Sequence, residues 1–196
     1  DFLKIFIELR PAKVPNYIDR TNKFIRSKSQ KIEQKFILKK INKYKKRIIL
    51  DYGSNDCYFA KFLDKKYSYY GVDNNPDLLN KNIKIFSNIF FFLNKKKLPF
   101  RQNFFEVIIL SHVIAHIYKP NDLLAKLKKV LKKDGILIII FHYKYYKFIY
   151  FFINLFNSYL PDETISKHYS INDIDKKIKE KWKILEKFSY SVNKKR

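Results

Sequence analysis

The stretch from Arg47 to Asp73, RIILDYGSNDCYFAKFLDKKYSYYGVD, decides the fold of this 196-residue chain. Its apolar run at 48–50 predicts a buried strand, and Gly53 begins a turn. A second strand is predicted to end at Asp73. Between the strands, four residues spaced to share one face predict a short helix (Tyr58, Phe59, Phe62 and Leu63). This order of strand, turn, helix, strand and terminal carboxylate is typical of the first half of a nucleotide-binding α/β unit.

The spacing within the turn indicates which nucleotide is bound. In the dinucleotide pattern G-x-G-x-x-G, the third glycine lets the helix pack close to the strand, but that place holds Tyr58. A nicotinamide-dependent dehydrogenase is therefore disfavoured. The pattern G-x-G-x-G fits better, with Gly53, Asn55 and Cys57 at its three places. Asparagine tolerates positive φ better than most residues, and cysteine is small.

Residues 50–63, LDYGSNDCYFAKFL, resemble motif I of the class I S-adenosylmethionine-dependent methyltransferases, with substitutions at two of the three glycines. The sequence YYGVDNNPDLL, from Tyr69, resembles the second motif of that family. The resemblance implies S-adenosyl-L-methionine as cofactor, and a carboxylate at Asp73 can accept two hydrogen bonds from its ribose. The cofactor-binding residues implied by these two motifs are Asp51, Tyr52, Gly53, Asn55, Asp73 and Asn74.

Two later stretches extend the resemblance. Asn88 and Ile89 stand where the family contacts adenine, and the block from Leu98 to Gly135 matches the family's LPF, F-D-x and K-P-G-G pattern with substitutions. Ser111, His112 and His116 follow the predicted strand at 107–110, at the edge where open α/β sheets bind ligands. Ser111 is a further cofactor candidate. His116 and His112 are candidate bases for a hydroxyl acceptor. The resemblance places His116 near the cofactor and favours that role for it, whereas a structural role is favoured for His112. We expect no metal site.

The whole chain predicts a three-layer Rossmann-like α/β fold with a mainly parallel sheet flanked by helices. Apolar runs at 83–86, 107–110 and 136–141 predict strands. An apolar helical face lies between the last two, and that helix is predicted to end at Gly135. A later helix is predicted from Ser170, with Trp182 on its inner face. Residues 1–45 are expected to form an N-terminal helical segment, with helices at 1–10 and from Thr21, that packs against the domain or covers its site. Residues 46–196 are expected to form the methyltransferase domain. The resemblance implies that the last strand of the sheet is antiparallel. Either the sheet lacks this strand or the sequence is clipped before it.

Composition limits the partners that the chain could have. The formal net charge of +24 suggests nucleic acid, but 36 of the 42 basic residues are scattered lysines, in a composition that A/T-rich codons alone would produce. Nucleic acid is thus a less favoured partner than a small-molecule acceptor. The aromatic segment 143–160 is too short to span a membrane. It could pack on the sheet, line an apolar pocket or touch a membrane surface.

These observations predict an enzyme that methylates a small-molecule, lipid-like or glycan-precursor acceptor by direct displacement. The single cysteine suits a cytoplasmic location, with peripheral membrane contact as a further option. Two alternatives stay open. One is an RNA methyltransferase that uses the basic surface, and the other is an inactive binding or scaffold protein with the same fold.

Overall fold

The computed structural model describes residues 3–11, 22–55, 57–74, 98–143, 171–178 and 182–189. Within these ranges the strands are β1 (Leu3–Pro11), β2 (Ile48–Tyr52), β3 (Ser68–Val72), β4 (Phe105–Ser111), β5 (Leu131–Tyr143) and β6 (Trp182–Ser189). The α-helices are α1 (Asn22–Lys43), α3 (Pro120–Val130) and α5 (Ile171–Ile178). Two 3-10 helices, η1 (Tyr58–Phe62) and η2 (Ile114–His116), follow β2 and β4.

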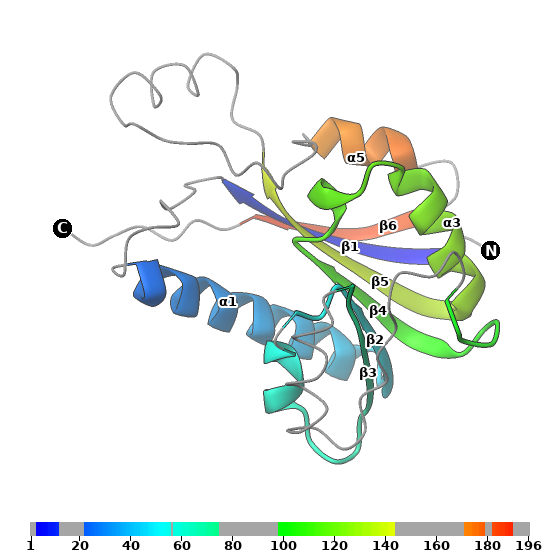
Figure 1. Ribbon diagram of the computed structural model, residues 1–196, viewed down its shortest axis with the longest axis horizontal. Helices are drawn as coiled ribbons and strands as arrows, with labels where there is room; N and C mark the ends of the chain where they lie inside the picture. Colours follow the sequence, from blue (N-terminus) through cyan, green and yellow to red (C-terminus); the bar gives the residue numbers. More distant parts are fainter. Residues whose placement is uncertain are drawn as a thin grey trace.

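The described strands form one six-stranded sheet in the order β3-β2-β4-β5-β1-β6, and each pair of neighbours is parallel. Helix α1 covers one face of the sheet, while α3 and α5 lie over the other (Figure 1). The central strands are buried on both faces, as a sheet between two helical layers requires. The predicted three-layer, mainly parallel fold is confirmed.

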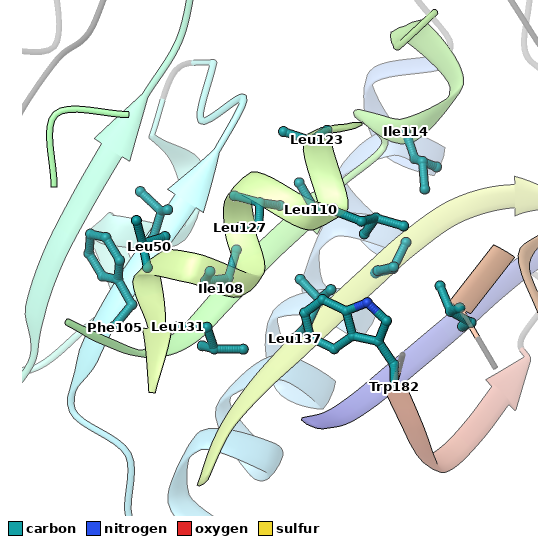
Figure 2. Packing of buried hydrophobic residues seen from close by; sticks show 14 of the residues in the cluster. Leu50, Phe105, Ile108, Leu110, Ile114, Leu123, Leu127, Leu131, Leu137 and Trp182 are labelled. Atoms are coloured by element: carbon teal, nitrogen blue, oxygen red, sulfur yellow. The ribbon is translucent and has the colours of Figure 1, made fainter. Parts of the chain in front are cut away.

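Two hydrophobic clusters, one on each face, hold these layers together. Alternate residues of the central strands enter opposite clusters, because successive side chains of a strand point to opposite faces. Leu110 and Leu137 pack with α3, α5 and Trp182 (Figure 2), whereas Ile109 and Ile138 pack with α1. Each face of the sheet is therefore matched to its own helical layer.

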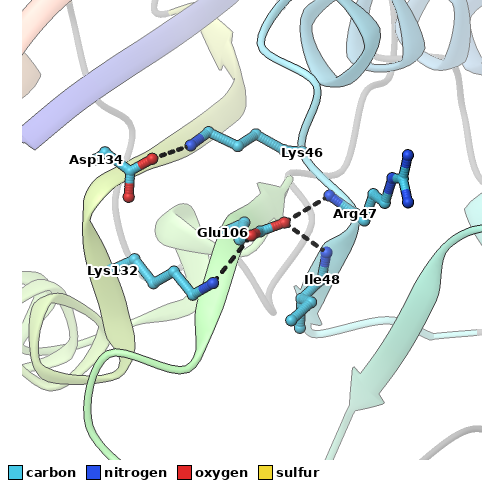
Figure 3. A network of polar contacts seen from close by, with 6 residues as sticks. All are labelled: Lys46, Arg47, Ile48, Glu106, Lys132 and Asp134. Carbon is cyan, nitrogen blue, oxygen red and sulfur yellow. Dashed lines mark hydrogen bonds and ion pairs between the residues drawn. The ribbon is translucent and has the colours of Figure 1, made fainter.

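A network of polar contacts fixes the amino ends of β2 and β4 (Figure 3). Glu106 accepts hydrogen bonds from the backbone N–H groups of Arg47 at 2.7 Å and Ile48 at 3.2 Å, and from Lys132 Nζ at 2.9 Å. Burial opposes ionisation of this carboxyl group, but the three hydrogen bonds lower its pKa below the ordinary value of 4.5. This network lies at the end of the strands opposite the turn at Gly53.

The N-terminal segment differs from the prediction. The apolar pattern at 1–10 was expected to form a helix, but Leu3–Pro11 is strand β1, paired with β5 on one side and β6 on the other. A run rich in Phe, Ile and Leu suits either element, and sheet pairing on both sides decided between them. The division of the chain at residue 45 stays a prediction.

The expected antiparallel last strand is also wrong for the described residues, since β6 runs parallel to β1. Trp182 was expected on the preceding helix but is the first residue of β6. Gly135 was expected to end a helix. Instead α3 ends at Val130, and Gly135 lies in β5 where the pairing with β4 shifts register. The predicted strand at 83–86 and the segment 144–160 lie outside the described residues.

The described helices include none that is long and apolar enough to cross a membrane.

Candidate functional site

The order of the strands places a candidate site at the carboxyl ends of β2, β3 and β4. From β2 the chain continues to β3 on one side, and β4 lies on the other side of β2. Where the connections from two neighbouring parallel strands lead to opposite sides, a crevice opens at the carboxyl ends of the strands. Open α/β sheets bind ligands in this crevice. The turn at Gly53 follows β2, and His112 follows β4.

The turn after β2 has an unusual backbone conformation. Gly53 has φ 75°, Asn55 has φ 47° and Cys57 has φ 50°. These are the three places of the G-x-G-x-G pattern, and each lies in the left-handed region that glycine favours. The N–H groups of Gly53 and Ser54 donate to the carbonyl oxygen of Val72 at 2.7 and 3.0 Å, which anchors the turn to the end of β3.

The turn also packs against the segment that follows β4. A Cβ atom added at Gly53 would lie 2.4 Å from Cγ2 of Val113, closer than real Cβ contacts. Glycine at this place therefore serves two needs, a positive φ and a close approach between two loops. The turn after β2 and the segment after β4 are thus in direct contact across the edge of the sheet.

Asp73 links the ends of β2 and β3. Its Oδ2 accepts a hydrogen bond from the backbone N–H of Asn55 at 2.8 Å, so the carboxylate is oriented beside the turn. Burial, together with the negative charge of Asp73, raises the pKa of Tyr52 above 10.0. Asn74, the next residue along the chain, is exposed.

Asp51 lies below the turn. It is 6% exposed, and its Oδ2 accepts a hydrogen bond from the hydroxyl of Tyr69 at 2.6 Å. Burial raises the pKa of Tyr69 well above 10.0, and the charges of Asp51 and Cys57 add to the effect. The Cys57 thiol in turn lies 3.7 Å from Ser54 Oγ. Asp51 is therefore part of the buried support of the turn.

A second carboxylate reaches the edge from α1. Glu33 is 6% exposed, and its Oε1 and Oε2 lie 3.2 and 3.3 Å from His112 Nε2. Ser111 Oγ donates to Oε2 over a long 3.5 Å. His112 itself has φ 61°, and its N–H donates to the carbonyl oxygen of Ile140 at 2.8 Å. A left-handed histidine held in this way is the kind of strained residue that occurs at functional sites.

The structure brings together most of the residues that the sequence predicted. Asp51, Tyr52, Gly53, Asn55, Asp73 and Asn74 lie on or beside the turn. Ser111 is the last residue of the neighbouring strand β4, and His112 follows it. His116 is exposed on η2. Asn88 and Ile89 are outside the described residues, as is the side chain of His142. Among the described residues, no group of three or more His, Cys, Asp or Glu is placed to hold a metal ion.

The prediction missed Glu33. The sequence did contain an indication: Glu33 is an acidic residue on the apolar stripe of α1. It precedes Ile37 by four residues and Ile41 by eight, and both isoleucines are buried. An acid at such a position must be paired if it is buried. The sequence could have drawn attention to Glu33, but not to its partner, because the partner lies 79 residues away.

Comparisons with known proteins agree with this geometry. Residues 50–139 match the family model described as a methyltransferase domain. No curated protein matches the sequence. The solved structures that resemble the chain include YcgJ of Bacillus subtilis, with a TM-score of 0.58 and 19% identity over 69% of this chain and 61% of that one.

A second resembling structure is a SAM-dependent methyltransferase of Aquifex aeolicus, with a TM-score of 0.56 and 19% identity over 75% of this chain and 77% of that one. At this identity the two structures support the fold, and the chain spans less than two thirds of the length of YcgJ. The family match adds the type of domain, a methyltransferase domain. The chain thus has a fold similar to that of SAM-dependent methyltransferases, and its residues 50–139 match a methyltransferase domain.

Proposed function

We propose that the chain is an S-adenosylmethionine-dependent methyltransferase that methylates a small-molecule, lipid-like or glycan-precursor acceptor by direct displacement. The observation that carries this proposal is the conformation of the turn at 53–57. Positive φ at Gly53, Asn55 and Cys57 keeps the backbone that G-x-G-x-G would give, although two glycines are replaced. The proposal is thus compatible with the substitutions that would favour an inactive scaffold.

The residues at this edge suit the cofactor. The backbone at Gly53 has no side chain, so the segment after β4 can pack closely against the turn through Val113. The oriented carboxylate of Asp73 is a strong acceptor for the two hydroxyl groups of a ribose. We assign to Asn55 the task of orienting Asp73, since its N–H donates to that carboxylate. Asp51 supports the turn from below through Tyr69.

The bound cofactor supplies a methyl group on a positively charged sulfur, so the reaction mainly requires alignment. The protein must hold the acceptor in line with that methyl group and exclude water. We place this acceptor beside Ser111, His112 and His116, because these residues follow β4 at the edge that holds the turn. We therefore propose that the residues of the turn bind the cofactor and that the residues at the end of β4 contact the acceptor.

The acceptor class rests on one further point. The aromatic segment 143–160 continues directly from the carboxyl end of β5, which lies next to β4 in the sheet. An apolar segment that leaves from this edge suits an apolar acceptor better than a polyanion. The excess of lysine leaves RNA as the second candidate, and the two acceptors differ in how binding responds to salt.

The test begins with calorimetric titration of the purified protein with S-adenosylmethionine and with S-adenosylhomocysteine. We expect both to bind, and failure of both would contradict the proposal. Protein and methyl-labelled cofactor are then incubated with fractionated cell extract. We expect the label in solvent-extractable or small-molecule fractions. Label in nuclease-sensitive material would instead support RNA, and binding without any transfer would support the scaffold function.

A further inference from the structure

Helix α1 carries a row of lysines along the side that faces away from the sheet. These residues follow one another at intervals of four, and all of them are exposed: Lys31, Lys35, Lys39 and Lys43. Side chains four residues apart are neighbours on the surface of a helix. At a rise of about 1.5 Å per residue, the row is ~18 Å long.

The lysine row has no compensating acid on its own helix. Glu33 is the one acidic residue in the sequence of α1, and it is buried. Within the part of the chain that the structure describes, none of the four lysines forms an ion pair, whereas Lys40 of the same helix pairs with Glu186. Like charges four residues apart destabilise a helix. The row therefore costs stability in the isolated protein, and an anionic partner would remove that cost.

The basic composition of the chain does not by itself explain this arrangement. Of the exposed residues between 30 and 43, all except Asn42 are lysines. The helices over the opposite face also expose lysines, but their exposed residues include the acids Asp122 of α3 and Asp173 of α5. The fold thus gathers on one helix a positive charge that is scattered in the sequence. Such clustering is what an electrostatic binding surface requires.

We propose that the lysine row of α1 is a docking surface for a membrane that contains anionic lipids. Clusters of four to eight basic residues on one face of a helix are typical of proteins that bind such lipids. Lysine suits this partner, because its compact, hydrated charge contacts headgroups without a fixed geometry. The attraction is electrostatic, since the apolar residues Phe36, Ile37 and Ile41 of α1 are buried against the sheet.

The lysine row suits a membrane better than RNA. Proteins that bind single-stranded nucleic acid combine a basic groove with aromatic side chains on which the bases stack. Among the described elements, α1 runs along the outside of its face of the sheet (Figure 1). The half-buried residues that border the row are Ile32, Gln34 and Leu38. At its end the ring of Tyr44 is already in contact with Lys43, whose Nζ lies 5.6 Å from the ring centre.

The row begins beside the candidate site. Glu33, two residues after Lys31, contacts His112 at the carboxyl end of β4. Lys46, just beyond the other end of α1, pairs with Asp134 near the start of β5. Helix α1 therefore crosses the sheet from the edge with the crevice to the opposite edge, and docking along α1 would bring the crevice close to the lipid. The docking requires neither cofactor nor acceptor, so this inference goes beyond the proposed function.

The test is sedimentation of the purified protein with lipid vesicles near physiological salt. Vesicles of phosphatidylcholine alone are compared with vesicles in which a third of the lipid is phosphatidylglycerol. We expect binding to the anionic vesicles only, and weaker binding as salt is added. Each lysine near an anionic surface contributes about fivefold to binding. A variant with all four lysines of the row changed to glutamine should therefore bind at least roughly a hundredfold more weakly.

The matched control removes the same amount of charge elsewhere. Four exposed lysines of α3, β5 and α5 are changed to glutamine: Lys126, Lys129, Lys133 and Lys176. This variant should bind within about threefold of wild type, because charges more than a Debye length from the surface are screened. Glutamine is a good helix former, and circular dichroism should show that both variants are folded. An equal loss in both variants would show that only net charge matters and would overturn the inference.

A parallel titration with a single-stranded uridine oligonucleotide tests the other polyanion. Failure of wild type to bind anionic vesicles would overturn the inference. So would a preference for the oligonucleotide that is lost when the lysine row is removed. Calorimetry with S-adenosylhomocysteine separates the two proposals. Cofactor binding without vesicle binding means that only the docking surface fails, and vesicle binding without cofactor binding means that only the proposed function fails.

Discussion

Replacing Asp73 by Asn tests the cofactor site with the smallest change of shape. The amide oxygen of asparagine can still accept the N–H of Asn55, which lies 2.8 Å from the carboxylate in the structure. What disappears is the negative charge that we assign to the ribose. The variant should therefore fold normally and bind the cofactor more weakly.

The size of the effect follows from the hydrogen bonds involved. A hydrogen bond to a charged group contributes about 1.5–3 kcal/mol, and one between neutral groups about 0.5–1.5 kcal/mol. Losing the charge in two bonds to a ribose diol thus costs about 2 kcal/mol, which corresponds to roughly a thirtyfold increase in Kd. Asp73→Ala, which removes both acceptors and the contact with Asn55, should weaken binding by at least the same factor.

Asp51→Asn provides the contrast. Asp51 is buried below the turn, and an amide oxygen can still accept the hydroxyl proton of Tyr69. We expect its Kd for S-adenosylhomocysteine to stay within about threefold of wild type, because Asp51 supports the turn through Tyr69 and does not contact the cofactor itself. Calorimetry on wild type, Asp73→Asn and Asp51→Asn gives the comparison. Equal affinity of Asp73→Asn and wild type would refute the ribose assignment, and a larger loss in Asp51→Asn would refute its supporting role.

Two further predictions concern stability. Gly53→Ala should lower the free energy of unfolding, measured in urea, by about 2–4 kcal/mol, because alanine is strained at positive φ and its Cβ clashes with Val113. Adding Val113→Ala should recover part of that loss. An equal loss in the double variant would contradict the clash. Because the folded-state pKa of Glu106 is lowered, its contribution is present above about pH 4.5 and disappears as the pH falls through the folded-state value. Glu106→Gln should cost about 1–2 kcal/mol at pH 7, and this cost should shrink as the pH is lowered below 4.5. A cost that grows in acid would contradict the lowered pKa.

The sequence predicted the inner part of the fold well because local signals and sheet burial agree there. The strands at β2, β3, β4 and β5 are apolar runs that a doubly covered parallel sheet requires. The helix expected after Gly53 is shorter than its pattern suggested, since Tyr58–Phe62 forms a 3-10 helix. With Cys57 in the left-handed region, the chain enters this segment from a strained residue.

The outer part of the sheet could not be predicted in the same way. Leu3–Pro11 has a pattern that fits a helix or a strand, and only β5 and β6, more than 100 residues later, make it a strand. For the candidate site, the motif residues around Gly53 and Asp73 came from the spacing within the turn and from the resemblance to two family motifs. Glu33 did not, because its importance depends on a contact with His112 that no local pattern encodes.

The position of β1 has a consequence for how the chain is assembled. Leu3 lies opposite Trp182, and β1 separates β5 from β6, so β1 pairs with two strands that follow it by more than 100 residues. The inner strands can pair while synthesis continues, but β6 has no place in the sheet until β1 is there to receive it. Contacts so distant in sequence slow folding. We therefore expect the two strands beyond β5 to be the late-forming part of the described sheet.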